Sequence, residues 1–209
     1  MNRMLEEQGG RVLAFGAHPD DLEVGAGGLL ARLSAEGAEV TLAIVSIPSD
    51  VERRRDEARA AAELIDADLF VVYEDRPARV EDIPMHELVR RFDTIVGDVR
   101  PDLVITHSAN DLHWDHGLVN RATVSALRRT PCDLLAYLSS PEMNAQARAI
   151  GNCFADITGY VETKLAAISC HASQLPKLDL ESSRDLARAM GRISGYEFAE
   201  SFEVLRVRV

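Results

Sequence analysis

The chain has 209 residues, of which 46% are hydrophobic and 27% are charged, and these values are typical of one globular domain. Its formal net charge of −11 at pH 7 argues against binding along a nucleic-acid backbone or docking on an anionic membrane, because both need a basic face. No CxxC pair, signal-peptide-like run or long apolar stretch is present, and the three cysteines are an odd number, so we expect a cytoplasmic protein without disulfides or membrane insertion.

Short apolar runs alternate with helix-forming segments along the first 140 residues. The apolar runs end at turn-forming residues, so each is predicted to be a strand: 12–17, 40–47, 68–73, 103–106 and 134–138. The segments between them are predicted to be helices: 25–37, 51–65, 84–99 and, after a polar loop at 107–117, about 12 residues ending at Arg129. Apolar residues of these elements, Phe70 and Phe92 among them, are assigned to the core.

This alternation predicts an α/β fold, a single-domain Rossmann-like three-layer sandwich with a mostly parallel sheet. The domain is expected to span residues 1–209, with a regular core at 1–140 and a C-terminal elaboration at 141–209. The elaboration is less regular: we expect helices at 161–170 and 182–190 and a closing strand at 202–209.

Two polar segments follow predicted strands that are neighbours at the switch point of such a sheet. The first is HPDD at 18–21, and the second is DLHWDH at 111–116. Ligands bind outside the carboxyl ends of parallel strands, so the two segments should face each other there. Imidazoles and carboxylates suit Zn²⁺ and tolerate Fe²⁺. His18, one aspartate of the first segment and one histidine of the second would leave a coordination position open for water.

These segments resemble the motifs of the PIG-L/LmbE-like family of zinc-dependent N-deacetylases, which act on N-acetylglucosamine conjugates. The specific elements are AHPDD at 17–21 and HWDH at 113–116; weaker similarities lie at 54–57, in KLAAISCHASQ at 164–174 and in YEFAESF at 196–202. The resemblance covers nearly the whole chain. It implies a hydrolase that removes an N-acetyl group from a small-molecule amino-sugar conjugate.

The resemblance also implies a role for each motif residue. His18, Asp21 and His116 become the metal ligands, with Zn²⁺ expected and Fe²⁺ or another divalent ion as the alternative. Asp20 becomes the general base for the attacking water, and a protonated His113 stabilises the oxyanion. Asp115 becomes the carboxylate that orients His113.

Substrate-binding roles are expected for Arg54, Asn110 and His171. The chain departs from the family pattern at two places, and both concern the choice of substrate. Trp114 stands where relatives often carry proline, and Asp111 stands where some relatives carry an aromatic residue. Relatives often assemble, so the resemblance is compatible with a homo-oligomer.

Three alternatives belong to other classes of protein. A nucleotide-binding domain would use the glycines near residue 25, but the chain lacks GxGxxG, and two carboxylates would repel a pyrophosphate. A non-catalytic binding protein on the same fold would not need the complete set of ligands and base. A nucleophilic hydrolase is disfavoured because the chain lacks GxSxG. The adjacent Cys170 and His171 would point in different directions on a helix, so they make a poor catalytic dyad.

Overall fold

The computed structural model describes residues 10–74, 79–139 and 151–208, so most of the segment before Arg11, where no signal peptide is expected, lies outside it. The described strands form one seven-stranded sheet in the order β3-β2-β1-β4-β5-β7-β6, parallel except at β7. They are β1 (Arg11–Gly16), β2 (Glu39–Ile44), β3 (Asp68–Val71), β4 (Leu103–His107), β5 (Asp133–Tyr137), β6 (Cys153–Asp156) and β7 (Ala199–Arg206).

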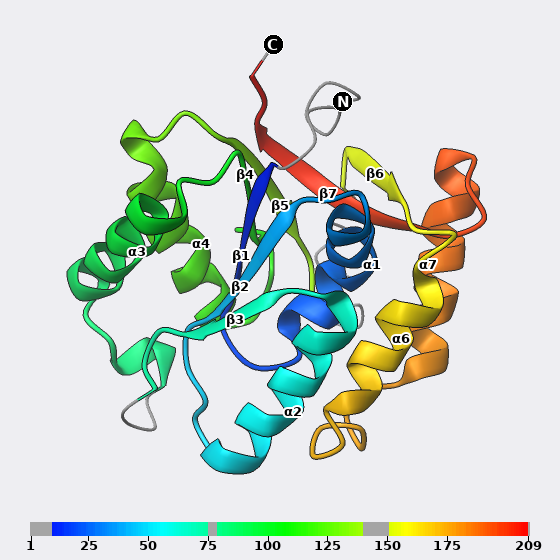
Figure 1. Cartoon of the computed structure of the whole chain (residues 1–209), viewed down its shortest axis with the longest axis horizontal. Helices are drawn as coiled ribbons and strands as arrows, with labels where there is room; N and C mark the ends of the chain where they lie inside the picture. The colour runs from blue at the N-terminus through cyan, green and yellow to red at the C-terminus, as the bar shows by residue number, and fades with distance from the viewer. Residues whose placement is uncertain (1–9, 75–78, 140–150, 209) are drawn as a thin grey trace.

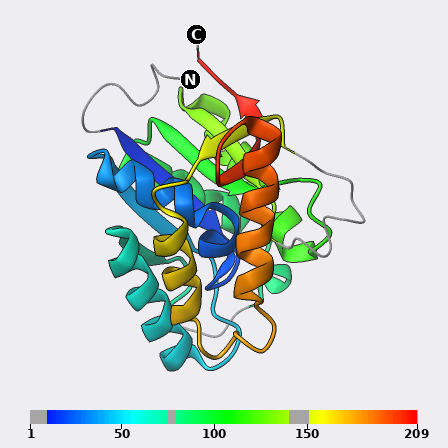
Figure 2. The same cartoon turned by 90° about the vertical axis from the view of Figure 1, so that its right-hand side faces the viewer.

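Helices cover both faces of the sheet and complete three layers. The described helices are α1 (Asp21–Ala35), α2 (Val51–Ile65), α3 (Met85–Val99), α4 (Trp114–Ala126), α6 (Val161–Cys170) and α7 (Leu180–Ser194). In Figure 1, α3 and α4 lie to the left of the sheet, α1, α6 and α7 lie to its right, and α2 lies below it. Figure 2 shows α6 and α7 side by side on that second face. The predicted α/β three-layer architecture with a mostly parallel sheet is therefore confirmed.

The two helical layers are held by two hydrophobic cores, one on each face of the sheet. Successive side chains of a strand point to opposite faces. In β1, Val12 and Ala14 join the core beneath α1 and α2, whereas Leu13 and Phe15 join the core beneath α3 and α4. The ring of Phe15 stacks on that of Phe92 from α3, with ring centroids 4.1 Å apart. A continuous apolar run is thus what this doubly covered sheet requires.

The structure differs from the sequence prediction at several element boundaries. Helix α1 begins at Asp21, four residues before the predicted start, and α4 begins inside the predicted polar loop. Strand β6 was not anticipated, and it pairs with β7, which overlaps the predicted closing strand but begins and ends three residues earlier. Phe70 is 47% exposed because β3 is an edge strand, so its assignment to the core was wrong.

A close approach between α1 and the end of β5 explains one of the glycines near the first turn. A Cβ atom at Gly25 would overlap the ring of Tyr137. The hydroxyl of Tyr137 donates a hydrogen bond to the carbonyl of Phe15 at 3.0 Å. Gly25 therefore serves packing between α1 and the sheet, and needs no bound phosphate to account for it.

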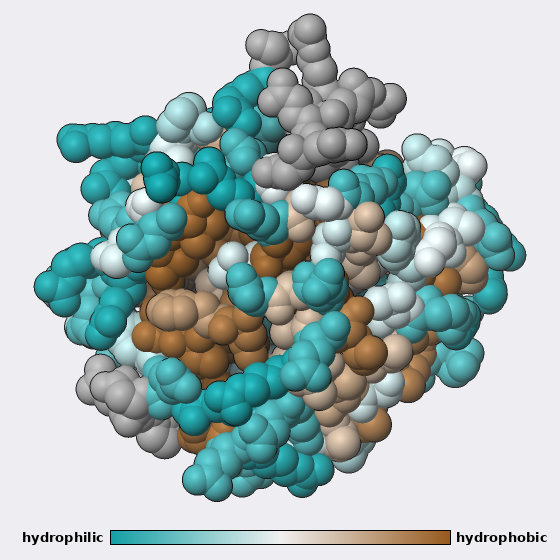
Figure 3. Space-filling model, viewed as in Figure 1, coloured by the Kyte–Doolittle hydropathy of each residue, from teal (hydrophilic) through white to brown (hydrophobic). Residues whose placement is uncertain are grey.

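The face of the molecule seen in Figure 3 is largely hydrophilic around a hydrophobic hollow. In Figure 3, hydrophobic residues gather between α3 and strands β2 and β3. None of the helices in the described ranges is long and apolar enough to cross a membrane.

Candidate metal centre

The two motif segments meet at the carboxyl edge of the sheet because β1 and β4 are parallel neighbours. His18 follows β1, His107 is the last residue of β4, and His116 lies in the first turn of α4. Asp21 is the first residue of α1. Residues about ninety positions apart in the sequence are thus brought into one cluster.

His18, Asp21 and His116 each offer one ligand atom, and these atoms all lie within 4.8 Å of one another. Nε2 of His116 is 3.3 Å from Oδ1 of Asp21, and Nδ1 of His18 is 3.6 Å from Oδ2 of the same carboxylate. Ligands sit about 2.0–2.2 Å from a bound Zn²⁺, so donors sharing one ion lie roughly 3–4 Å apart. Two imidazole nitrogens and one carboxylate oxygen at this spacing fit a single divalent ion.

Asp111 and Ser139 surround the second ring nitrogen of His116. Oδ2 of Asp111 lies 2.9 Å from Nδ1 of His116, and Oγ of Ser139 lies 3.1 Å from the same nitrogen. The Ser139 hydroxyl also reaches Oδ2 of Asp111 at 3.3 Å. Asp111 is therefore a buried partner of the candidate ligand His116. The sequence offered no signal for this role, or for that of Ser139 beyond its place just after a strand.

His107, the last residue of β4, is fully buried, and its side chain contacts Asp21. Its Nε2 accepts a hydrogen bond from the backbone amide of Ala17 at 3.0 Å and lies 3.3 Å from Oδ2 of Asp21. The pKa of His107 is lowered to about 4 by burial and by the neighbouring His116. A neutral His107 thus borders the candidate ligand Asp21. Together with Asp111 and His116 it also forms a second group of three potential metal-binding side chains.

Charge is divided unequally among the clustered groups. Burial opposes the charged form of His116, but the Asp21 and Asp111 carboxylates outweigh it and raise its pKa to about 10. Burial likewise opposes the ionised form of Asp21, yet His116 and His107 hold the pKa of Asp21 well below its usual value. The pair is therefore an imidazolium beside a carboxylate.

Asp20 has a different environment from its neighbour Asp21. Its backbone is left-handed, with φ 99°, a conformation that non-glycine residues rarely adopt. It occupies the N-cap position of α1, yet its carboxylate makes no capping hydrogen bond within the described chain. Burial and the adjacent Asp21 carboxylate raise the pKa of Asp20 to about 7. The Asp20 carboxyl therefore makes no capping hydrogen bond to the described part of α1, and it titrates near neutral pH.

His113 and Asp115 are arranged differently from the expectation. The Asp115 carboxylate contacts Nε2 of His18 at 3.0 Å, and the backbone amide of Asp115, not its side chain, donates to Nδ1 of His113 at 3.3 Å. That bond caps α4 and places the proton of a neutral imidazole on Nε2. Burial and the rings of His116 and His18 lower the pKa of His113. The geometry thus gives a neutral His113 where a protonated one was expected.

The three expected substrate-binding residues lie in three different settings. Arg54 is buried, donates to the carbonyl of Pro19 at 3.1 Å and lies 3.8 Å from Oδ2 of Asp20, so it belongs to the cluster. Asn110 is exposed, and its amide donates to Oε1 of Glu203 at 2.7 Å.

His171 lies in a buried, acidic setting, where the Glu23, Asp20 and Glu57 carboxylates outweigh burial and raise its pKa. It is fully buried, with Nε2 3.4 Å from Oε2 of the buried Glu23, and neither ring nitrogen makes a hydrogen bond within the described ranges. His171 follows the last residue of α6, a helix that packs against both α1 and α2.

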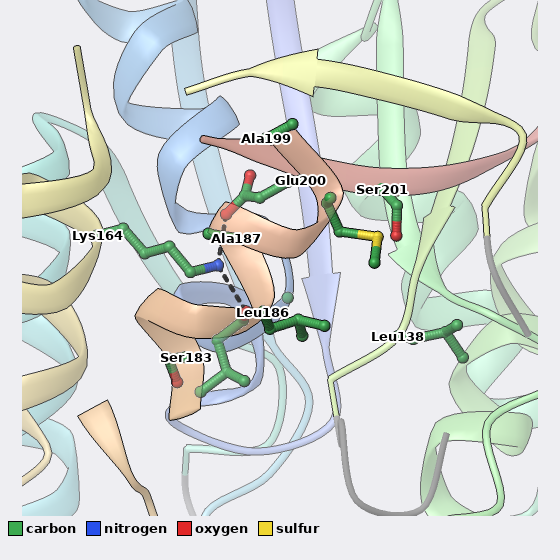
Figure 4. A pocket seen from close by; sticks show the side chains of 11 residues that line it. Leu138, Lys164, Ser183, Leu186, Ala187, Ala199, Glu200 and Ser201 are labelled. Carbon is green, nitrogen blue, oxygen red and sulfur yellow. Dashed lines mark hydrogen bonds and ion pairs between the residues drawn. The ribbon is translucent and has the colours of Figure 1, made fainter. Parts of the chain in front are cut away.

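A buried ion pair joins the C-terminal segment to α1. Figure 4 shows Lys164 of α6 reaching toward Glu200 of β7, beside a small pocket. Nζ of Lys164 also donates to the carbonyl of Val24 at 2.7 Å. The Glu200 carboxylate accepts from the amides of Gly28 at 2.9 Å and Leu29 at 2.8 Å. The two weaker sequence similarities around 164 and 200 thus meet on the helix that begins with Asp21.

Comparison with known proteins identifies relatives that are named as enzymes. The chain is 26% identical to diacetylchitobiose deacetylase of Thermococcus kodakarensis over an alignment of 223 positions, gaps included, with 91% of this chain and 81% of that protein covered. It is 30% identical over 173 residues to 4-oxalmesaconate hydratase of Pseudomonas putida, covering 77% of this chain and 63% of that one.

The fold and the family are also matched directly. The crystal structure of the conserved protein TT1542 from Thermus thermophilus superimposes with a TM-score of 0.79 at 23% identity, covering 95% of this chain and 96% of that one. The model of the PIG-L family, described as GlcNAc-PI de-N-acetylase, matches residues 13–127, a range that contains both motif segments. The chain therefore belongs to the PIG-L deacetylase family.

Proposed function

We propose that the protein is a metal-dependent hydrolase that removes the N-acetyl group of an N-acetylglucosamine-type conjugate. The observation that carries the proposal is the cluster itself: three candidate ligands within 4.8 Å of one another, with Asp20 and His113 beside them. Zn²⁺ as the native metal, a cytoplasmic location, a homo-oligomer and one domain over residues 1–209 stay predictions.

His18, Asp21 and His116 would hold the ion. A divalent ion at such a site polarises the amide carbonyl and makes water a stronger nucleophile near neutral pH. Asp20 takes the proton from the attacking water as oxygen adds to the carbonyl carbon. It then returns that proton to the nitrogen as the carbon–nitrogen bond breaks, giving acetate and the free amine. A pKa near 7 suits a group that must both accept and donate a proton.

His113 would stabilise the negative oxygen that forms during attack. Because Nδ1 accepts from the Asp115 amide, Nε2–H is the donor that the ring can offer. The ring stacks on that of His116, with centroids 4.3 Å apart, which holds it next to the candidate ligand. One such donor is worth about 100- to 1,000-fold in rate.

Arg54 supports the same role for Asp20. Its guanidinium lies near both the Pro19 carbonyl and the Asp20 carboxylate, and it keeps the loop in place at the left-handed residue. We expect it to steady the loop that carries the base.

The test is acetate release from small N-acetylglucosamine conjugates, with the metal content measured in the same samples. Asp20→Asn should keep the metal and lose about 100- to 10,000-fold in kcat, since general-base catalysis contributes that much. Asp98→Asn, at an exposed position on α3, serves as the control and should match the wild type. Near-normal turnover by Asp20→Asn with stoichiometric metal would contradict the assignment of the base.

A second candidate reaction is the addition of water to the double bond of an unsaturated carboxylic acid. It is favoured by the 30% identity to a relative named as a hydratase. The same residues would activate water for either reaction, so the substrate decides. Loss of the ultraviolet absorbance of a conjugated diacid, without acetate release from any amide, would replace the first proposal by this one.

A further inference from the structure

A groove lies directly beside His113, between the loop at 109–113 and one face of α4. Leu112, Trp114, Gly117 and Arg121 line it, and its volume is about 160 Å³, several times the roughly 30 Å³ that one water molecule occupies in the liquid. His113 and Asp111 border both this groove and the histidine cluster. A substrate that presents its amide to His113 therefore extends naturally into the groove.

The wall of the groove carries two large hydrophobic side chains exposed to solvent. Trp114 is 63% exposed and Leu112 is 51% exposed. A tryptophan on the surface next to a reaction centre offers a flat apolar face on which a ring can rest. Trp114 also lies directly after His113, so this apolar wall begins beside the proposed oxyanion donor.

The far end of the groove carries a cation. Arg121 lies two helical turns after Trp114 and so projects from the same face of α4. It is exposed, and it has neither an ion pair nor a hydrogen bond to any other described residue. Gly117 stands between the two, and a Cβ atom there would meet open space. The groove is therefore open from Trp114 to a guanidinium that no other described residue pairs with, in a chain whose net charge is −11.

We propose that this groove is a binding subsite for the group attached to the amino sugar, and that this group combines a flat or apolar portion with a terminal carboxylate or phosphate. The apolar portion rests on Trp114 and Leu112. The anionic end pairs with Arg121, whose planar fork of donors matches such groups. This inference rests on the proposed deacetylase function and names the class of substrate for the same site.

The test compares two N-acetylglucosaminides that differ only in charge, one with a 4-carboxyphenyl group and one with a 4-carbamoylphenyl group. The wild type should show a higher kcat/KM for the charged compound. Arg121→Gln should reduce that preference by about tenfold, which is the smaller end of a charge-assisted hydrogen bond, because the charged compound loses more than the neutral one. Arg129→Gln, an exposed arginine just after α4, is the matched control and should keep the preference.

Trp114 is the only tryptophan in the chain, so its fluorescence reports occupancy of the groove without turnover. In the Asp20→Asn background, the charged glycoside should shift the Trp114 emission and bind more tightly than the neutral one. Gly117→Leu, which fills the groove, should weaken binding of both compounds.

The outcomes separate the two proposals. Equal kcat/KM for the two compounds in the wild type, or an anion preference that survives Arg121→Gln, would overturn the subsite while leaving acetate release intact. A Trp114 response with the predicted charge preference, together with no acetate release by the wild type, would support the subsite and reject the deacetylase reaction.

Discussion

At the scale of single residues, the candidate centre depends on what holds the second nitrogen of each histidine. Nδ1 of His116 faces Asp111 and Ser139, so the ring can turn only Nε2 toward Asp21. Contacts of this kind fix the orientation of a metal-binding imidazole and raise its basicity. Asp111 is therefore expected to matter for metal affinity without itself being required as a ligand.

Asp111→Asn should lower the affinity for Zn²⁺ by about 10- to 100-fold, because it removes the carboxylate that orients His116. A competition titration against a fluorescent chelator measures this directly. Asp98→Asn again provides an exposed aspartate as control. If Asp111→Asn binds Zn²⁺ as tightly as the wild type, the orienting role is wrong.

The sequence could predict the motif residues but not their partners. Each of the motifs HPDD and HWDH is an unbroken run of residues near the end of a predicted strand. The proximity of His18, Asp21 and His116 could therefore be predicted from the sequence. Ser139 and Tyr137 reach the cluster from the end of β5, and nothing local in the sequence marks them. The buried environment of His171 was missed for the same reason, since burial is a property of the assembled layers.

At the scale of elements, α1 is tied to the C-terminal segment by the Lys164–Glu200 pair. Both side chains are nearly inaccessible to solvent. The Glu200 carboxylate accepts hydrogen bonds from two backbone amides in the middle of α1, and the Lys164 ammonium donates one to the Val24 carbonyl. The pair thus anchors the helix whose first residue is Asp21.

Glu200→Gln should destabilise the protein by about 3–5 kcal/mol, because it leaves the Lys164 ammonium buried without its counter-charge. Urea unfolding measures the change. Replacing both residues, as Lys164→Met with Glu200→Leu, should recover much of the loss, since the Gly28 amide can then bond the Val24 carbonyl within the helix.

The matched control is Glu162→Gln, which breaks the solvent-exposed pair between α6 and Arg184 of α7. Its unfolding midpoint should stay close to that of the wild type, because exposed ion pairs contribute little. An equal effect of the buried and exposed substitutions would show that Glu200 does not anchor α1.

Helix and strand identities were largely predictable, whereas the starts of α1 and α4 were not. The bounds of α2 and α6 agree with the prediction because their patterns are long and uninterrupted. Helix α1 begins at Asp21, and Asp115 is the second residue of α4; such polar residues are typical of loops, but both are buried here in the cluster.

At the scale of the whole molecule, the cluster joins the two halves of the sheet. His18 and Asp21 follow β1, and His116 follows β4, so an ion held by all three would bridge segments about ninety residues apart. A ligand that binds only the folded state stabilises it by mass action.

Zn²⁺ at 100 times its Kd should therefore stabilise the metal-free protein by about 2.7 kcal/mol, or roughly 5–10 °C in Tm for a chain of this size. His116→Ala should abolish the shift, and His86→Ala, at an exposed position, should keep it. The stabilisation should grow from pH 6 to pH 8, because His116, with a pKa raised to about 10, must lose a proton to bind the ion. A shift that is independent of pH, or that survives His116→Ala, would exclude this histidine as a ligand.

The overall architecture was the most predictable level, since the alternation of strand and helix patterns dictates a parallel sheet covered on both faces. The unanticipated part is the edge formed by β6 and β7. Strand β6 has only four residues, and its pairing is decided by β7, which lies more than forty residues further along the chain. Such non-local pairing leaves no periodic trace.

The left-handed backbone at Asp20 restricts which residue types can occupy this position. Glycine, asparagine and aspartate tolerate that conformation, and most other residues do not. An aspartate-to-asparagine exchange would thus retain the turn, the neighbouring ligands and the groove while silencing proton transfer. A descendant that still binds the proposed amino-sugar conjugate but no longer removes its acetyl group, a lectin-like derivative, is one substitution away.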